Sequence, residues 1–137
     1  MDQNRIKILL VDDDDIDSEA IERLVRNKKF PYEITTAFSR EEAIKKIVDH
    51  QYDLILLDYE YQDGNAFDVM PYIKNTPIIF VTGSGSEKIA VEAIKMGAKD
   101  YLIKDPERNY LTVLPLTINN VLEYNKCEVD ARMREDR

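Results

Sequence analysis

Apolar runs of strand length alternate along this chain with segments in which apolar residues recur at helical spacing. The alternation predicts five strands, each followed by a helix, at residues 5–11, 33–38, 53–58, 77–82 and 99–104. Strands that alternate with helices pair in parallel, and their helices then cover both faces of the sheet. The first and third strands are almost wholly apolar, which indicates central positions in such a sheet. The pattern therefore predicts one α/β domain.

The first two predicted helices are amphipathic. One face of the first helix carries Ile16, Ala20, Ile21, Leu24 and Val25. One face of the second carries Ala43, Ile44, Ile47 and Val48. Two serine–glutamate pairs have the spacing of a capping box, Ser39 with Glu42 and Ser84 with Glu87. They predict that helices begin just after Phe38 and just after Ser84.

Polar side chains stand where four of the strands end. The first strand runs into Asp12 and Asp13, the third into Asp58, the fourth into Thr82 and the fifth into Lys104. In a doubly wound, flavodoxin-like sheet of strand order 2-1-3-4-5, the first and third strands are neighbours, and ligands bind at the carboxyl ends of the strands. Adjacent carboxylates repel one another, so their clustering there indicates a divalent cation or a phosphate-handling site.

Further acids follow Asp13 directly, at Asp14, Asp15 and Asp17. Carboxylates suit the positive end of a helix dipole, so these three are interpreted as a solvated first helical turn. His50, between a helix and a strand, is interpreted as an ordinary loop residue.

Length, composition, net charge and cysteine content make several classes of protein less favourable for this chain. With 137 residues and 44% hydrophobic composition, the chain suits a single core. Its net charge of −8 disfavours direct binding to nucleic acid or to anionic membranes. The lone Cys127 cannot form an internal disulfide, and the first apolar run is too short for a membrane span. A cytoplasmic protein is expected.

Several of these motifs together resemble the response-regulator receiver domain of two-component and chemotaxis signalling. The resemblance covers about residues 5 to 125 and rests on segments 8–13 and 53–59, on 81–83, on Gly97-Ala98 with Asp100-Tyr101, and on Lys104. It implies that Asp58 accepts a phosphoryl group from a histidine kinase or phosphotransfer protein. It also implies that Asp12 and Asp13 help to hold Mg²⁺, and that Thr82, Tyr101 and Lys104 respond to the phosphoryl group.

Each implied role has a chemical basis. A carboxylate is a competent nucleophile toward phosphorus, but a cation must intervene between the two anions. Mg²⁺ prefers oxygen ligands, which Asp13, Asp58, the main-chain carbonyl of Glu60 and, through water, Asp12 would supply; Mn²⁺ is a conceivable substitute. Lys104 and the hydroxyl of Thr82 would bind phosphoryl oxygens, and the ring of Tyr101 would turn inward when Thr82 moves.

The chain departs from the family pattern in four places. Gln62 stands where proline is common, Asn65-Ala66 replace a frequent Asp-Gly, Gly83 replaces a frequent alanine, and Asp105 separates Lys104 from Pro106. None of these departures removes a reacting group. They predict a less rigid loop after Asp58 and a more open site beside Thr82.

Two alternative functions remain open from the residues. A phosphatase with an aspartyl nucleophile needs the same groups, although Glu60 is not the second aspartate that such enzymes commonly use. A pseudo-receiver that acts only as an interaction module would not need the complete set of site residues. An EF-hand loop starting at Asp13 is rejected, because Ser18 and Leu24 occupy its glycine and glutamate positions.

The C-terminal segment is expected to form a polar helix extension or linker at residues 126–137, after a receiver domain at 1–125. The family resemblance implies that an unidentified effector binds the face formed by the fourth helix, fifth strand and fifth helix. A homodimer is left open. The expected protein is thus a signalling receiver that catalyses only its own phosphorylation and dephosphorylation.

Overall fold

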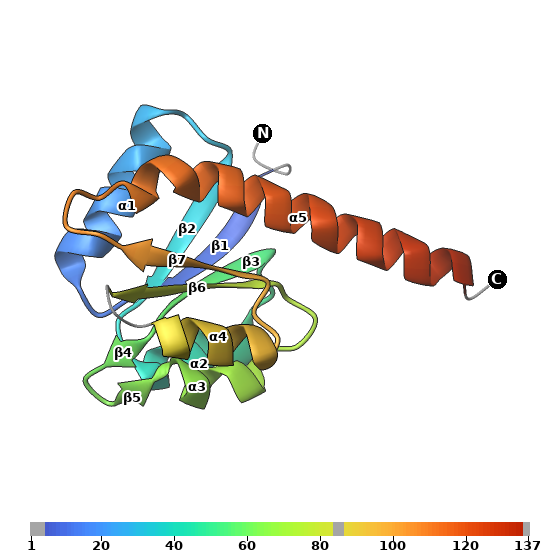
Figure 1. The fold of residues 1–137 in the computed structure, drawn as a ribbon, viewed down its shortest axis with the longest axis horizontal. Coiled ribbons are helices and arrows are strands. Elements are labelled where there is room, and N and C mark those ends of the chain that lie inside the picture. The colour runs from blue at the N-terminus through green and yellow to red at the C-terminus, as the bar shows by residue number, and fades with distance from the viewer. Residues whose placement is uncertain (1–4, 84–86, 136–137) are drawn as a thin grey trace.

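A five-stranded parallel sheet forms the middle layer of the protein (Figure 1). The computed structural model describes residues 5–83 and 87–135. The strands lie in the order β2-β1-β3-β6-β7, with bounds β2 Tyr32–Ala37, β1 Ile6–Val11, β3 Leu54–Asp58, β6 Ile78–Gly83 and β7 Asp100–Lys104. Counted along the chain, β6 and β7 are the fourth and fifth strands of this sheet. The predicted order 2-1-3-4-5 is therefore confirmed.

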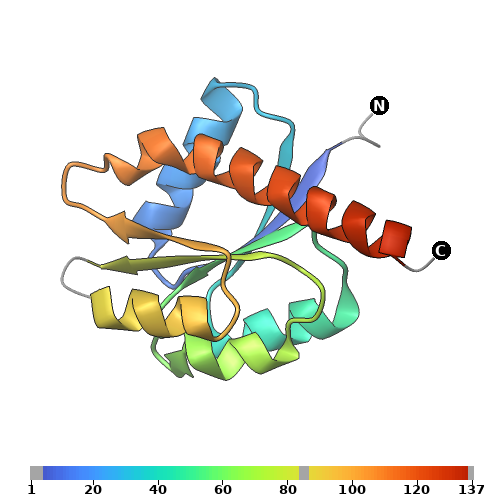
Figure 2. The same ribbon diagram turned by 45° about the vertical axis from the view of Figure 1, so that its right-hand side comes forward.

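Five α-helices cover the two faces of the sheet (Figure 2). One face carries α1 Asp15–Asn27 and α5 Tyr110–Glu135, and the other carries α2 Arg40–Asp49, α3 Ala66–Val69 and α4 Glu87–Lys95. A 3-10 helix, Met70–Tyr72, continues α3, and a two-stranded antiparallel hairpin, β4 Glu60–Tyr61 with β5 Gly64–Asn65, follows β3. This is the doubly wound, flavodoxin-like arrangement expected from the sequence.

The central strands bury both of their faces. In β1, Leu9 and Val11 pack into the core under α2, α3 and α4, whereas Ile8 and Leu10 pack into the core under α1 and α5. Residues of β3 alternate in the same way. The hydrophobic effect therefore fixes the register of β1 against β3, because a slip by one residue would exchange the two packed faces.

The predicted start of α2 is confirmed. The Ser39 hydroxyl accepts a hydrogen bond of 3.0 Å from the Glu42 amide, and the Glu42 carboxylate accepts one of 2.6 Å from the Phe38 amide. The second predicted capping pair includes Ser84, which lies outside the described residues.

Two apolar residues predicted to pack are exposed. Ile16 is 65% exposed and Val48 is 67% exposed. Each lies in a terminal turn of its helix, where the helical spacing continues but the core beneath is formed by the middle turns. The prediction was wrong at these two positions and right for Ala20, Ile21 and Ala43, which are buried.

Three side chains at or next to the sequence departures form hydrogen bonds with helix N-termini. Asp63, in the hairpin after Asp58, accepts hydrogen bonds from the amides of Arg40 and Glu41 at the start of α2. Asn65 caps α3 in a capping box with Asp68. Asp105, inserted after Lys104, accepts from the amides of Asn109 and Tyr110 where α5 begins.

The last helix is longer than the sheet beneath it and extends beyond the other elements (Figure 1). Among the residues of α5 up to 128, whose burial is described, the buried ones lie between Tyr110 and Val121. Within the described ranges, no helix combines the length and apolar character that a membrane crossing requires.

Candidate functional site

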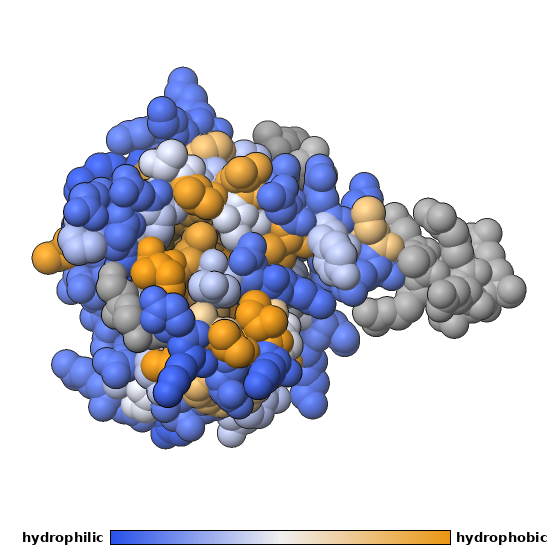
Figure 3. Space-filling view, viewed as in Figure 1, coloured by the Kyte–Doolittle hydropathy of each residue, from blue (hydrophilic) through white to orange (hydrophobic). Residues whose placement is uncertain are grey.

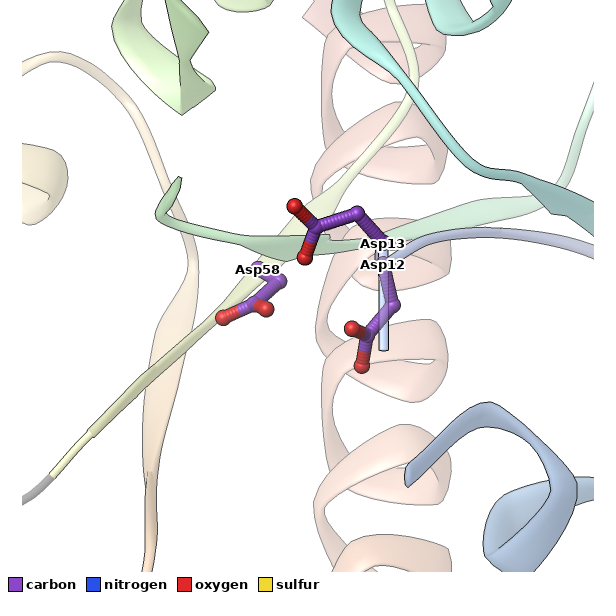
Figure 4. Close-up of side chains that lie close together, drawn as sticks. All are labelled: Asp12, Asp13 and Asp58. Atoms are coloured by element: carbon purple, nitrogen blue, oxygen red, sulfur yellow. The ribbon is translucent and has the colours of Figure 1, made fainter. Parts of the chain in front are cut away.

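Three carboxylates meet where β1 and β3 end (Figure 4). The two strands pair in parallel, with Val11 opposite Leu57, so the residues that follow these positions are brought together. One carboxylate oxygen from each of Asp12, Asp13 and Asp58 lies within 4.8 Å of the others. The topology therefore places these three side chains together, as the strand order predicts.

The main chain orients two of these carboxylates. Asp12 is 1% exposed, and its Oδ1 accepts a 2.9 Å hydrogen bond from the Asp14 amide. Oδ1 of Asp58 accepts a 2.9 Å hydrogen bond from the Tyr59 amide. Asp13 is exposed. The cluster thus runs from a buried, fixed carboxylate to one that is open to solvent.

Lys104 brings a positive charge into the cluster from β7. Its Nζ donates to Oδ2 of Asp12 at 2.9 Å, to Oδ2 of Asp17 at 2.9 Å and to Oδ2 of Asp58 at 3.2 Å. The Lys104 side chain is 14% exposed, so solvent screens these ion pairs less than it would on an open surface.

Burial and the neighbouring charges shift the pKa values of Asp58, Asp12 and Lys104. The pKa of Asp58 is raised to about 7, mainly because burial disfavours the charged form; the Lys104 ammonium opposes this shift and the Asp12 carboxylate adds to it. The pKa of Asp12 is also raised, again chiefly by burial. For Lys104, burial lowers the pKa, but the carboxylates of Asp58 and Asp12 outweigh it, so its pKa lies above the usual value.

Thr82 is fully buried at the carboxyl end of β6, the strand that pairs with β3. Because Val81 lies opposite Asp58, Thr82 comes one residue further along β6 than the position level with Asp58. In the part of the chain that the structure describes, no hydrogen-bond partner reaches its Oγ1. A buried hydroxyl without a partner is uncommon and is available to a group that enters the site.

The other two predicted site residues, Tyr101 and Glu60, are not among the three clustered carboxylates. Tyr101, opposite Phe80 in the β6–β7 pairing, is 39% exposed. Glu60 begins the hairpin, and its side chain is exposed. Glu60 nevertheless lines the same open cleft of about 460 Å³ as Asp13, Asp58 and Lys104.

One site residue was missed from the sequence. Asp17 was interpreted as a solvated residue of the first helical turn, but its carboxylate bonds Lys104 and its side chain is only 22% exposed. The available signal was its position in the first turn of α1, which follows directly on the strand end that carries Asp12 and Asp13. Asp14 fits its predicted role, since it caps α1 by accepting from the amides of Ile16 and Asp17.

The arrangement combines three chemical capabilities. The three clustered carboxylates offer the hard oxygen ligands that divalent cations such as Mg²⁺ prefer. Asp58 offers an oxygen nucleophile beside them, and Lys104 offers a fixed cation that can bind an anionic group.

Comparison with known proteins identifies one family. The family model for the response regulator receiver domain matches residues 8–114. The transcriptional regulatory protein ResD of Bacillus subtilis is 39% identical over 76% of this chain and 44% of its own length. The transcriptional regulatory protein CrdR of Helicobacter pylori is 32% identical over 72% of this chain and 47% of its own length. The chain thus spans less than half the length of these relatives.

A solved structure supports the same assignment. The response regulator receiver domain protein from Clostridium thermocellum superposes with a TM-score of 0.77 at 27% identity. The match covers 89% of this chain and 98% of that one.

Proposed function

Since the chain belongs to the family of response-regulator receiver domains, we propose that it receives a phosphoryl group on Asp58 and that this changes a surface that binds a partner. The proposed donor is a phosphohistidine of a histidine kinase or of a phosphotransfer protein. The chain would then catalyse only its own phosphorylation and dephosphorylation.

The position of Asp58 is the observation that carries this proposal. It lies at the end of a central strand, between two carboxylates suited to a metal ion and the ammonium of Lys104. A nucleophilic anion placed between two cationic positions is what transfer of an anionic group requires, because each cation lowers the repulsion between nucleophile and phosphoryl group.

The residues present fit a Mg²⁺ ion. Side-chain oxygens of Asp13 and Asp58, the main-chain carbonyl of Glu60 and, through water, Asp12 would hold it, and Mn²⁺ would be an acceptable substitute. When bound, the ion would neutralise part of the carboxylate charge and of the charge on the phosphoryl oxygens. The raised pKa values of Asp12 and Asp58 suit this role, because burial disfavours the charged form of each carboxyl group and a bound cation would favour it.

The transfer step is a displacement at phosphorus. An oxygen of the Asp58 carboxylate forms a bond to phosphorus while the phosphorus–nitrogen bond of the phosphohistidine breaks, and the imidazole nitrogen keeps the electron pair. Lys104 stays protonated and binds a phosphoryl oxygen in place of the Asp58 carboxylate oxygen. The Thr82 hydroxyl, which is buried and free of partners among the described residues, donates to another phosphoryl oxygen.

The proposed switch links Thr82 to Tyr101. Thr82 lies opposite Ile103 in the β6–β7 pairing, two residues along β7 from Tyr101. When Thr82 moves toward the phosphoryl group, it leaves space beside β7, and the half-exposed ring of Tyr101 turns inward to fill it.

The effector surface in this proposal is the face formed by α4, β7 and α5. Exposed apolar side chains gather over these elements (Figure 3), among them Val91, Ile94, Val113 and Leu116. Tyr101 lies on the strand between the two helices, so its rotation would alter this face directly. An effector protein is the proposed partner; a second copy of the chain would use the same apolar side chains.

Residues 126–137, which include the end of α5, would extend the receiver domain at 1–125, and the protein would work in the cytoplasm.

Incubation with acetyl phosphate and Mg²⁺, followed by intact mass measurement, tests this proposal. We expect one added phosphoryl group, which is absent in Asp58→Asn and in a metal-free sample. A folded, metal-binding protein that gains no phosphoryl group would favour an interaction module without phosphorylation. Continuous hydrolysis of an unrelated phosphate ester would favour a phosphatase with an aspartyl nucleophile.

A further inference from the structure

Lys104 has a carboxylate partner that belongs to a different element from the acceptor cluster. Asp17, in the first turn of α1, accepts from Lys104 Nζ at 2.9 Å, which is shorter than the 3.2 Å from Nζ to Asp58. Asp17 is not among the three carboxylates that lie close enough together to hold one ion. Its contact with Lys104 is therefore not explained by metal binding.

An ammonium group donates through N–H groups that can point to different acceptors, and among the described residues Lys104 donates to the carboxylates of Asp12, Asp17 and Asp58. The contact with Asp58 is the one that a phosphoryl oxygen would take over. Asp12 is almost completely buried and fixes the ammonium at the base of the site. Asp17 belongs to the first turn of α1, so its 2.9 Å contact links the ammonium to that helix.

The negative charge of Asp17 also weakens the attraction of Lys104 for an incoming phosphoryl group. Asp17 adds a negative charge within ion-pair distance of the cation that the incoming dianion needs. Its side chain is 22% exposed, so solvent screens this charge only in part.

We propose that Asp17 is a positioning residue that holds Lys104 toward α1 and so restrains transfer of a phosphoryl group to Asp58. The inference deepens the proposed function and rests on it. Within the described part of the chain, Asp17 makes no hydrogen bond to Asp58, Asp12 or Asp13; it acts through Lys104. The first turn of α1 thereby gains a direct ionic connection to the site.

The test compares rate constants for phosphorylation by acetyl phosphate at saturating Mg²⁺. In this reaction an Asp58 oxygen bonds to phosphorus as the bond from phosphorus to the acetyl oxygen breaks, and acetate leaves with the electron pair. We expect Asp17→Asn to raise the rate constant about threefold to fivefold, the scale of a partly exposed ion pair. Asp17→Glu, which keeps the carboxylate, should restore a rate close to that of the wild type.

Asp15→Asn is the matched control, because Asp15 is an exposed acid in the same helical turn and loses the same charge. Its rate should stay within about twofold of the wild type. A rate for Asp17→Asn that is no higher than that of Asp15→Asn would overturn the inference.

A double-mutant cycle separates action through Lys104 from a general charge effect. In a Lys104→Gln background, Asp17→Asn should give no more acceleration than Asp15→Asn. Persistence of the full acceleration without Lys104 would contradict the inference. Absence of any phosphorylation in the wild-type protein would instead contradict the proposed function, so the two failures are distinguishable.

Discussion

At the scale of residues, the site concentrates negative charge in a partly buried position. Asp12 is buried and Asp58 is partly buried. Both carboxyl groups have raised pKa values, and burial is the largest cause of each shift. Lys104 offsets only part of this charge. The ionised acceptor therefore costs folding free energy when no cation is bound, which is a common feature of sites arranged for function.

The Asp58 carboxyl should make the stability of the metal-free protein depend on pH. Its folded pKa of about 7 lies above the ordinary value of 3.8, so the folded state binds more protons than the unfolded state between these values. The free energy of unfolding should therefore fall as pH rises from about 4 to about 7. Removing this ionisation by Asp58→Asn should stabilise the metal-free protein at pH 7.5 by about 1–3 kcal/mol.

Urea unfolding in the presence of a chelator measures this effect across the pH range. The stability difference between Asp58→Asn and the wild type should shrink toward pH 4, and added Mg²⁺ should favour the wild type. Equal stability of the two proteins at every pH would show that the acceptor carboxylate carries no folding cost.

At the scale of elements, hydrophobic periodicity predicts the helices because burial of one face decides each of them, and continuous apolar runs predict the central strands because both of their faces are buried. The capping pair at Ser39 was recognisable from the sequence because both partners lie within four residues. The role of Asp63 was not recognisable, since its partners, the amides at the start of α2, are more than twenty residues away. Exposure of Ile16 and Val48 was missed because periodicity does not tell where the packed part of a helix ends.

Two glycines near the site should respond very differently to alanine. Gly64 has a positive φ of 153°, and an added Cβ would lie 2.6 Å from Oδ2 of Asp68 and 2.7 Å from Cδ of Arg40. We expect Gly64→Ala to reduce the free energy of unfolding by about 1–3 kcal/mol. Gly83→Ala, where an added Cβ meets no atom of the described residues within 4 Å, should stay within about 0.5 kcal/mol of the wild type.

Chemical denaturation of both variants checks this pair. A stable Gly64→Ala protein would show that the hairpin after Asp58 can adjust without loss of packing. A strongly destabilised Gly83→Ala protein would show that the family's frequent alanine does not fit at this position.

At the scale of the whole molecule, topology assembles the site from distant parts of the sequence. The order of the strands brings Asp12, Asp13 and Asp58 together, and this followed from the pattern of strands and helices alone. The bond between Asp17 and Lys104 did not follow, because it depends on how the first turn of α1 is placed against the end of β7. The roles of Thr82 and Tyr101 came from the family resemblance and stay predictions.

Communication from the site to the α4–β7–α5 face should depend on the Thr82 hydroxyl. This hydroxyl is buried and has no partner in the described part of the chain, so Thr82→Ala should fold normally and still be phosphorylated. The amide chemical shifts of α4 and β7 should respond to phosphorylation much less than in the wild type, because the phosphoryl group loses its contact with β6. Thr82→Ser keeps the hydroxyl and should keep most of the response. A full response in Thr82→Ala would rule out this route.

The central claim is that Asp58, and no other member of the carboxylate cluster, accepts the phosphoryl group. Reduction of the phosphorylated protein with borohydride converts an aspartyl phosphate to homoserine, which peptide sequencing by mass spectrometry can locate. We expect homoserine at position 58 and unchanged aspartate at positions 12 and 13. Homoserine at position 12 or 13, or none in a protein that has gained a phosphoryl group, would contradict it.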